Sequence, residues 1–241
     1  MCGSLAARGF NILLPLSAAA FDAACAPVDP RLQLRSLHPA ANGALIIGSG
    51  GRALFERFGE SPERRDGRAS PLDRFTAAAI GAAAADALQK GGDGDATSFR
   101  LFFPFTDSVP ALPFQRLGRA AGLGGPGPLG LQIHPQFGPW WAYRGLIALA
   151  MSEAGWSAAG LGGALGDGCA GCAAPCVAAC PAGAVRSAGF SIADCHARRL
   201  TAPDCRLSCV ARIRCVRGPE HRYSDQQLAF HMAASMPVGR P

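Results

Sequence analysis

The sequence predicts an α/β protein, in the broad sense that includes α+β folds, with a small cysteine-rich module at its carboxy-terminal side. Apolar runs that suit buried strands alternate with helix-like stretches along most of the 241 residues. Hydrophobic residues make up 49% and charged residues 17%, a balance that predicts a packed core and excludes disorder and coiled coil. Eight of the ten cysteines lie between Cys169 and Cys215, which indicates a metal or iron–sulfur module joined to an ordinary globular domain.

The first predicted element is a strand over the apolar residues 10–16. A signal peptide is the alternative for this stretch, but its basic flank is Arg8 alone, and Asp22 stands just before the small residues where cleavage would fall. We therefore expect a retained strand and a cytoplasmic protein. No apolar run approaches the ~18 residues that a transmembrane helix needs, so no membrane partner is expected.

The next elements are a short buried strand at 44–47 and a helix at 52–58, joined by a glycine-rich turn. Residues 48–53 fit the spacing of a dinucleotide-binding fingerprint. That fingerprint needs an acidic residue at the end of a second strand about twenty positions on, and residues 63–67 form a polar loop instead. We therefore interpret the glycines as a tight turn and not as a nicotinamide site.

Further along, Ser70 as a cap and Pro71 at the first position predict a helix that continues to residue 89. The aromatic run 99–105 and the apolar run 143–151 predict two more strands. Residues 120–130 are so rich in Gly and Pro that an irregular loop is expected there.

These elements divide the chain into four segments. Residues 1–158 form the predicted main domain, and 159–168 form a Gly-rich linker. Residues 169–218 form the cysteine module, and 219–241 form a final helix with a tail. A capping box that starts at Ser224 predicts that this helix begins at the following residue.

The formal net charge of +6 does not favour nucleic-acid binding. The arginines are scattered, and no block of Lys and Arg is present. Clusters held by four thiolates would also bring negative charge to the module. Specific binding to nucleic acid is therefore not expected.

The first cysteine group resembles the cysteine run of bacterial ferredoxins. Its spacing is Cys169-x2-Cys172-x3-Cys176-x3-Cys180-Pro181, with one residue more than the ferredoxin run between its second and third cysteines. Three thiolates from one tight loop can cap three irons of a cubane, and small residues between them let backbone N–H groups approach the sulfides. Zinc is the alternative, but zinc sites normally pair two separated Cys-x2-Cys units. The run therefore predicts a [4Fe–4S] cluster.

A second group of four cysteines is spaced irregularly: Cys195, Cys205, Cys209 and Cys215. In two-cluster ferredoxins the fourth cysteine of a run ligates the other cluster. By that crossed arrangement, one cluster is predicted to take Cys169, Cys172, Cys176 and Cys215. The other is predicted to take Cys180, Cys195, Cys205 and Cys209. The alternative is a single cluster, with the remaining thiols buried as structural residues.

Residues 131–145 contain the run Ile133-His134-Pro135-Gln136-Phe137-Gly138-Pro139-Trp140. They resemble a stretch shared by cobalamin-processing chaperones and epoxyqueuosine reductases. The resemblance extends to the chaperones at residues 9–16, 44–58 and 71–73, and to the reductases at residues 106–110, 119–124 and the cysteine module. It implies a nitroreductase-like cobalamin-processing domain with a ferredoxin-like iron–sulfur module, and cobalamin as a further cofactor.

The same resemblance implies roles for single residues. Asp107 stands where the reductases carry a proton donor, and the alternative is a helix or turn cap. His134 and Pro135 are candidates for contacts to a corrinoid, with a structural histidine at a turn as the alternative. Trp140 is a candidate for covering the macrocycle face, although one tryptophan of the adjacent pair is expected in the core. Arg144 would hold an anionic side group or pair with a surface acid.

Two departures from the reductases bear on function. Their lysine-bearing loop is replaced by residues 125–128, and the helical domain implied to help hold tRNA has no counterpart in this sequence, so epoxyqueuosine reduction on tRNA is not expected. The leading hypothesis is an iron–sulfur oxidoreductase that passes electrons from a donor such as a flavodoxin or a reductase to a corrinoid, or to a substrate in the same domain. The alternatives are a ferredoxin-type electron carrier without catalysis of its own and a zinc-stabilised interaction module.

Overall fold

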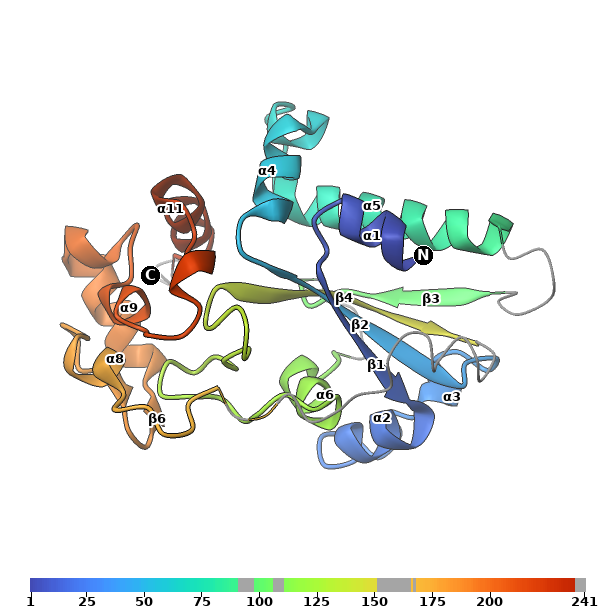
Figure 1. Cartoon of the computed structure of the whole chain (residues 1–241), viewed down its shortest axis with the longest axis horizontal. Coiled ribbons are helices and arrows are strands. Elements are labelled where there is room, and N and C mark those ends of the chain that lie inside the picture. The colour runs from blue at the N-terminus through green and yellow to red at the C-terminus, as the bar shows by residue number, and fades with distance from the viewer. Residues whose placement is uncertain (91–97, 106–110, 151–165, 167, 237–241) are drawn as a thin grey trace, which may run out of the picture. The chain divides into compact units, whose positions relative to one another are not determined.

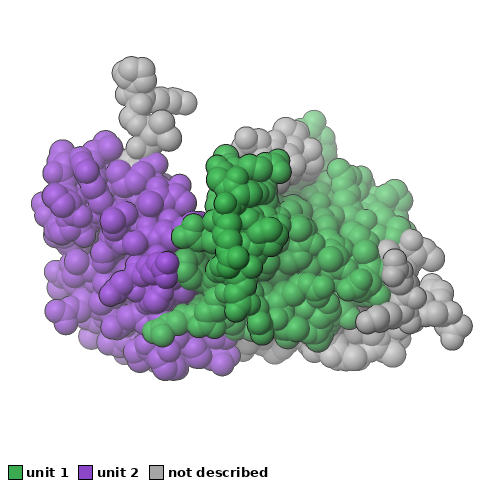
Figure 2. Space-filling view, turned by 90° about the horizontal axis from the view of Figure 1, so that it is seen from above, with its two compact units in different colours: residues 1–123, 142–165 green, residues 124–141, 166–241 purple. Residues whose placement is uncertain are grey.

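The computed structural model describes residues 1–90, 98–105, 111–150, 166 and 168–236. The chain divides into two compact units. The first unit comprises residues 1–123 and 142–165, and the second comprises residues 124–141 and 166–241 (Figure 2). None of the described helices is long and apolar enough to cross a membrane.

The first unit is built on a four-stranded sheet in the order β1-β2-β4-β3. Its strands are β1 (Ile12–Ser17), β2 (Gly43–Gly50), β3 (Phe99–Phe102) and β4 (Trp141–Leu149). β1 runs antiparallel to β2, and β3 runs antiparallel to β4. Every residue of β2 is buried, because this inner strand is covered on both faces. The strands predicted at 10–16, 44–47, 99–105 and 143–151 are therefore confirmed, with the third shorter than expected.

Helices cover both faces of this sheet. They are α1 (Cys2–Ala7), α2 (Ala18–Cys25), α3 (Leu34–Leu37), α4 (Ala53–Glu60), α5 (Pro71–Lys90) and α6 (Phe114–Ala120), with a 3-10 turn η1 (Pro62–Arg64). Figure 1 shows α1 and α5 on one side of the strands and α2 and α6 on the other. The apolar faces of these helices complete the core together with the strands, as Phe21, Phe58 and Ile80 are fully buried.

The glycine-rich segment after β2 is a tight turn, as predicted. Gly51 has a φ of +68°, in the left-handed region where glycine carries no steric cost. The helix after residue 70 also begins at Pro71 as predicted. Ser70, the expected cap, precedes this helix, and its carbonyl accepts a hydrogen bond from the Arg74 N–H at 3.1 Å. Its φ of +49° is left-handed, whereas a capping residue is normally extended.

The second unit consists of short elements around the cysteines. Its helices are α8 (Pro175–Ala178), α9 (Ile192–Thr201), α10 (Val210–Ile213) and α11 (Asp225–Ala234). Two 3-10 turns, η2 (Pro203–Cys205) and η3 (Pro219–His221), and a hairpin of β5 (Val185–Arg186) and β6 (Gly189–Phe190) complete it. The Ser224 side chain accepts a hydrogen bond from the Gln227 N–H at 3.1 Å, which confirms the predicted cap of the last helix. The ferredoxin-like character of this module stays a prediction.

The two units group the chain differently from the four expected segments. Residues 124–141 belong to the second unit, where the sequence had placed them in a main domain ending at residue 158. The final helix α11 also belongs there, because Leu228 packs with Tyr223 against Trp140 in one buried cluster. Most of the expected linker at 159–168 lies outside the described residues.

Candidate functional site

Four cysteines line a cavity of about 400 Å³ in the second unit, which we call the first cysteine cavity. They are Cys169, Cys172, Cys176 and Cys215. Leu129 and Ile133 contribute apolar walls, and in the described part of the chain Arg217 is the one charged residue that lines the cavity. This is the ligand set that the crossed arrangement predicts for one cluster, so a cysteine from the end of the module lies with three from its beginning.

The loop that carries the first three cysteines turns sharply at Ala174. This residue has a φ of +51°, a left-handed conformation that costs a non-glycine residue about 1–2 kcal/mol. Its backbone N–H points to the Cys172 sulfur at 3.4 Å, and the helix α8 that bears Cys176 begins at the next residue. The longer spacing between Cys172 and Cys176 is therefore accommodated by a reversal of the chain at Ala174.

Four other cysteines line a second cavity of about 360 Å³ in the same unit, the second cysteine cavity. They are Cys180, Cys195, Cys205 and Cys209, which again is the predicted crossed set. The walls are apolar side chains such as Val185, Phe190 and Met232. Three arginines also line it: Arg198, Arg199 and Arg212.

Burial raises the pKa of three of the thiols that line the two cavities. For Cys176, burial is the largest cause of the raised pKa, and the charge of the nearby Cys215 is the second. For Cys195, burial is again the largest cause, and the charge of Cys209 is the second. The pKa of Cys205 is raised for the same first reason. A thiol held in this way keeps its proton until a bound cation stabilises the thiolate, so loading of either cavity is expected to release protons.

All ten cysteines are free thiols, and the donor set of each cavity fits an iron–sulfur cluster. Among the described residues, no three His, Cys, Asp or Glu side chains are gathered tightly enough to hold one metal ion. A zinc ion bound at about 2.3 Å would bring its thiolates to within ~4 Å of one another. A cluster of four irons is larger and places its four cysteines around a volume. Each of the two cavities has on its walls the four cysteines that such a cluster takes.

His134 closes a tight turn in the second unit. Its backbone N–H and C=O exchange hydrogen bonds with Gly138 at 2.9 and 2.8 Å, and its Nδ1 accepts the N–H groups of Gln136 and Phe137 at 3.2 and 3.3 Å. The ring is 8% exposed, and burial, with His221 as a second cause, lowers its pKa to about 4. The imidazole is therefore neutral and serves the turn, which matches the structural alternative, while Pro135 is exposed at its tip.

This buried histidine predicts a loss of stability at acid pH. Folding lowers the pKa of His134 from 6.5 to about 4. As the pH falls below 6.5, this histidine therefore becomes protonated in the unfolded chain while it stays neutral in the folded chain. The free energy of unfolding should decrease by roughly 3 kcal/mol at most as the pH falls from the higher to the lower of these two values. We expect the drop in melting temperature between pH 7.5 and 5 to be smaller for His134→Asn, whose side-chain oxygen can replace Nδ1 as acceptor. An equal drop in both proteins would contradict this.

The same turn supports the segment that follows Cys215. Gly138 has a φ of +59°, and a Cβ there would lie 2.0 Å from the Arg217 carbonyl oxygen. Gly218 has a φ of +57°, and a Cβ there would lie 2.5 Å from the Phe137 carbonyl carbon. The two backbones thus touch through glycines on both sides, so the turn fixes the chain two residues after Cys215.

Trp140 is fully buried within the second unit. The Arg212 guanidinium lies over its ring at 4.9 Å, and the ring of Tyr223 meets it edge-on at 5.5 Å. Trp141 is buried as well, and its Nε1 donates to the Gln132 carbonyl at 2.8 Å. The ring of Trp140 is therefore not exposed for the expected contact with a macrocycle, because both tryptophans pack against their own chain.

Arg144 belongs to a buried polar group in the first unit. It is 8% exposed and its Nε donates to the Ser49 hydroxyl at 2.8 Å, where the sequence had allowed a surface ion pair. Asp73 at the start of α5 faces the same charge. Burial raises the pKa of Asp73, and Arg144 offsets part of that rise. Sequence reasoning had given Asp73 no role, and Asp107, the predicted proton donor, lies outside the described residues.

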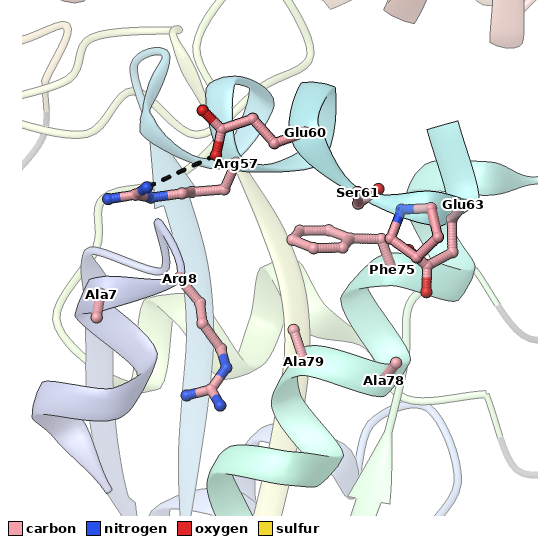
Figure 3. Close-up of a pocket in the computed structure, with 10 residues that line it drawn as sticks. Ala7, Arg8, Arg57, Glu60, Ser61, Glu63, Phe75, Ala78 and Ala79 are labelled. Atoms are coloured by element: carbon pink, nitrogen blue, oxygen red, sulfur yellow. Dashed lines mark ion pairs between the residues drawn. The ribbon is translucent and has the colours of Figure 1, made fainter. Parts of the chain in front are cut away.

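A shallow hollow of about 450 Å³ is also present on the first unit (Figure 3). Its floor is formed by Phe75, Ala78 and Ala79 of α5, and an ion pair between Arg57 and Glu60, 3.8 Å long, lies at its rim. Its lining includes none of the predicted site residues.

No protein-family model matches the sequence, and no curated protein matches it. Two solved structures share its fold at low sequence identity. Epoxyqueuosine reductase from Streptococcus thermophilus aligns with a TM-score of 0.57 and 13% identity, over 90% of this chain and 65% of the reductase, so the chain spans just under two thirds of that protein. The B12-trafficking protein CblC of C. elegans aligns with a TM-score of 0.53 and 14% identity, over 97% of this chain and 90% of CblC. The predicted resemblance is thereby confirmed at the level of structure, and the chain has a fold shared by an epoxyqueuosine reductase and a B12-trafficking protein.

Proposed function

We propose that the chain is an iron–sulfur oxidoreductase that carries two [4Fe–4S] clusters and delivers their electrons to a corrinoid, or to a substrate bound in the first unit. The observation that supports it most is the division of eight cysteines into two cavities of four, in the crossed pattern of two-cluster ferredoxins. A cluster bound in such a site supplies one-electron transfer at low potential.

The residues around the first cysteine cavity have separable tasks in this proposal. The thiolates ligate iron once their protons have left. Leu129 and Ile133 keep water away from the sulfur atoms, because both side chains are buried and line the cavity. Gly127 lets its loop approach, since a Cβ at this position would lie 2.6 Å from the Cys169 sulfur. The loop that replaces the lysine of the reductases therefore packs against the cysteine module.

A corrinoid or substrate would be recognised by the polar group of the first unit. Arg144 is held by Ser49 and faces Asp73, so it offers a fixed cation to an anionic side group. A carboxyl whose pKa is raised takes up a proton more readily than a free carboxyl, and it can give that proton up as electrons arrive. Asp73 is a candidate for that task beside Asp107. A flavodoxin or a reductase is proposed as the electron donor.

One observation favours the second candidate, an electron carrier with no corrinoid. Of the residues expected to contact the corrinoid, His134 and Trp140 are engaged within the second unit. Their contacts support the cysteine module and would be needed in a carrier as well. The first unit would then act as a binding platform without chemistry of its own.

Anaerobic titration of the cluster-loaded chain with cob(II)alamin, followed by electron paramagnetic resonance, separates the two functions. The reductase proposal expects saturable binding and a changed cobalt signal, with weaker binding for Arg144→Met. Tyr143 is the neighbouring β4 residue, and Tyr143→Phe serves as a conservative control that keeps the ring. An unchanged cobalt signal beside intact cluster signals would leave the electron carrier. A chain without iron after reconstitution would overturn both.

A further inference from the structure

The arginines of the second unit are distributed unequally between the two cysteine cavities. Among the described residues, three line the second cavity, namely Arg198, Arg199 and Arg212, and one, Arg217, lines the first. The sequence had shown only scattered arginines. The fold brings three of them to the walls of one cavity.

Arg199 is the most enclosed of these cations. It is the buried residue of α9, 5% exposed, four positions after Cys195 on the same helix. Its Nη1 donates to the Ser235 carbonyl at 2.8 Å, and its Nη2 donates to the Met232 carbonyl. Both carbonyls belong to the last turn and cap of α11, the end of a helix that favours positive charge. The guanidinium is therefore fixed in place by backbone groups.

No carboxylate among the described residues forms an ion pair with Arg199, and its Nε–H is buried without an acceptor there. A buried charge is costly unless an opposite charge lies close to it. The carbonyls of α11 offset part of that cost. The remaining negative charge would be the thiolates of the cavity that Arg199 lines, and Cys195 is near enough for the two groups to interact electrostatically.

The other two arginines of the second cavity are already engaged. Arg198 forms an ion pair with Asp204 at 2.9 Å, so a carboxylate balances its charge. Arg212 lies over the rings of Trp140 and Tyr223 and donates to the Pro139 carbonyl. Arg199 therefore differs from Arg198 in having no carboxylate partner among the described residues, and from Arg212 in lying on α9, the helix that bears Cys195.

We propose that Arg199 is the counter-ion of the cluster held by Cys180, Cys195, Cys205 and Cys209, and that it gives this cluster a higher reduction potential than the cluster of the first cavity. The inference rests on the proposed function, because it requires both clusters. Uptake of one electron by a four-thiolate cluster adds one negative charge, and a fixed cation nearby stabilises the more negative, reduced form. The first electron supplied to the protein then resides in the second cavity.

The test is a redox titration of the reconstituted protein with dithionite, in which electron paramagnetic resonance reports each reduced cluster. Arg199→Met is expected to lower one of the two midpoint potentials and to leave the other unchanged. At the wild-type midpoint, the ratio of reduced to oxidised cluster should fall about tenfold, which is ~59 mV for a one-electron couple. Arg199→Lys keeps the charge and should restore most of the difference.

Two matched variants identify the affected cluster. Arg217→Met removes the arginine that the described residues place on the wall of the first cavity, and it should lower the other potential. Arg186→Met removes an exposed arginine that pairs with Asp194 and lines neither cavity, so both potentials should stay as they are.

Several outcomes would overturn the inference. With both clusters present, unchanged potentials in Arg199→Met would exclude a counter-ion, and equal shifts of both would point to a general loss of structure. Loss of half the iron in both Arg199→Met and Arg199→Lys would mean that Arg199 only holds α11 in place through its hydrogen bonds to the carbonyls of that helix. Loss in Arg199→Met with a wild-type potential in Arg199→Lys would support the charge role. A wild-type protein with one cluster would instead refute the two-cluster proposal itself.

Discussion

Replacing Cys180 and Cys195 together by serine is expected to lower the bound iron from about eight to about four atoms per chain. Each single replacement is expected to lower the bound iron by the same amount. Both cysteines line the second cavity, so the second substitution removes a ligand from a cluster already lost. Replacing Cys176 and Cys180 together is expected to remove nearly all iron, because these two line different cavities. Iron analysis and visible absorption after anaerobic reconstitution measure both results.

The pair of double variants separates the crossed arrangement from its alternatives. If each cluster took the four cysteines nearest in sequence, Cys176 and Cys180 would share one cluster, and the two results would be exchanged. If the chain held a single cluster, the wild type would contain about four irons, and Cys195→Ser would keep them all. Cys2→Ser, which replaces an exposed thiol remote from both cavities in sequence, is the control and should change nothing.

Local patterns were enough to predict much of the first unit. The run Ala44–Ile47 is apolar without interruption, which an inner strand requires when both of its faces are covered, and β2 is buried along its whole length. Pro71 at the first helical position and the Ala-rich stretch after it predict α5 because both act within one helix. The left-handed conformation of Ser70 could not be predicted in this way, because serine is normally extended at a cap position.

The composition of the two cysteine cavities was also predictable, because ligand spacing in such modules reflects a loop geometry that few chains can satisfy otherwise. The roles of His134 and Trp140 were not. A buried histidine and tryptophan have the same sequence character whether they contact a ligand or their own chain, and only the contacts to Gln136 and Arg212 distinguish the two. Arg199 was missed for a related reason. Its position four residues after Cys195 was the available signal, since residues so spaced share one helix face.

The division between the units changes how the segment 131–145 is understood. Its first part belongs with the cysteines, and from residue 142 on it belongs to the sheet of the first unit. The glycine of the His134–Gly138 turn touches the chain beyond Cys215. A motif that resembles a cofactor-binding stretch therefore has a structural task in the described part of the chain, which is to hold the last cysteine of the first cavity.

Gly138→Ala measures that structural task and is expected to be strongly destabilising. A left-handed alanine costs about 1–2 kcal/mol by itself. The added Cβ would also lie 2.0 Å from the Arg217 carbonyl oxygen, a backbone atom, so the segment after Cys215 must move, at a further cost of roughly 1–3 kcal/mol. We expect a lower melting temperature and preferential loss of the first cluster.

Gly183→Ala is the matched control for this substitution. Gly183 lies in the same unit with a φ of +60°, against +59° for Gly138, and its Cβ would meet nothing within 4 Å. It therefore carries the backbone penalty without the overlap, and the difference between the two variants isolates the contact with Arg217. Loss of about four irons in Gly138→Ala, with none lost in Gly183→Ala, would tie the turn to the first cavity. Equal melting temperatures and full iron in both variants would mean that the segment after Cys215 adjusts freely, and the turn would then have no part in holding Cys215.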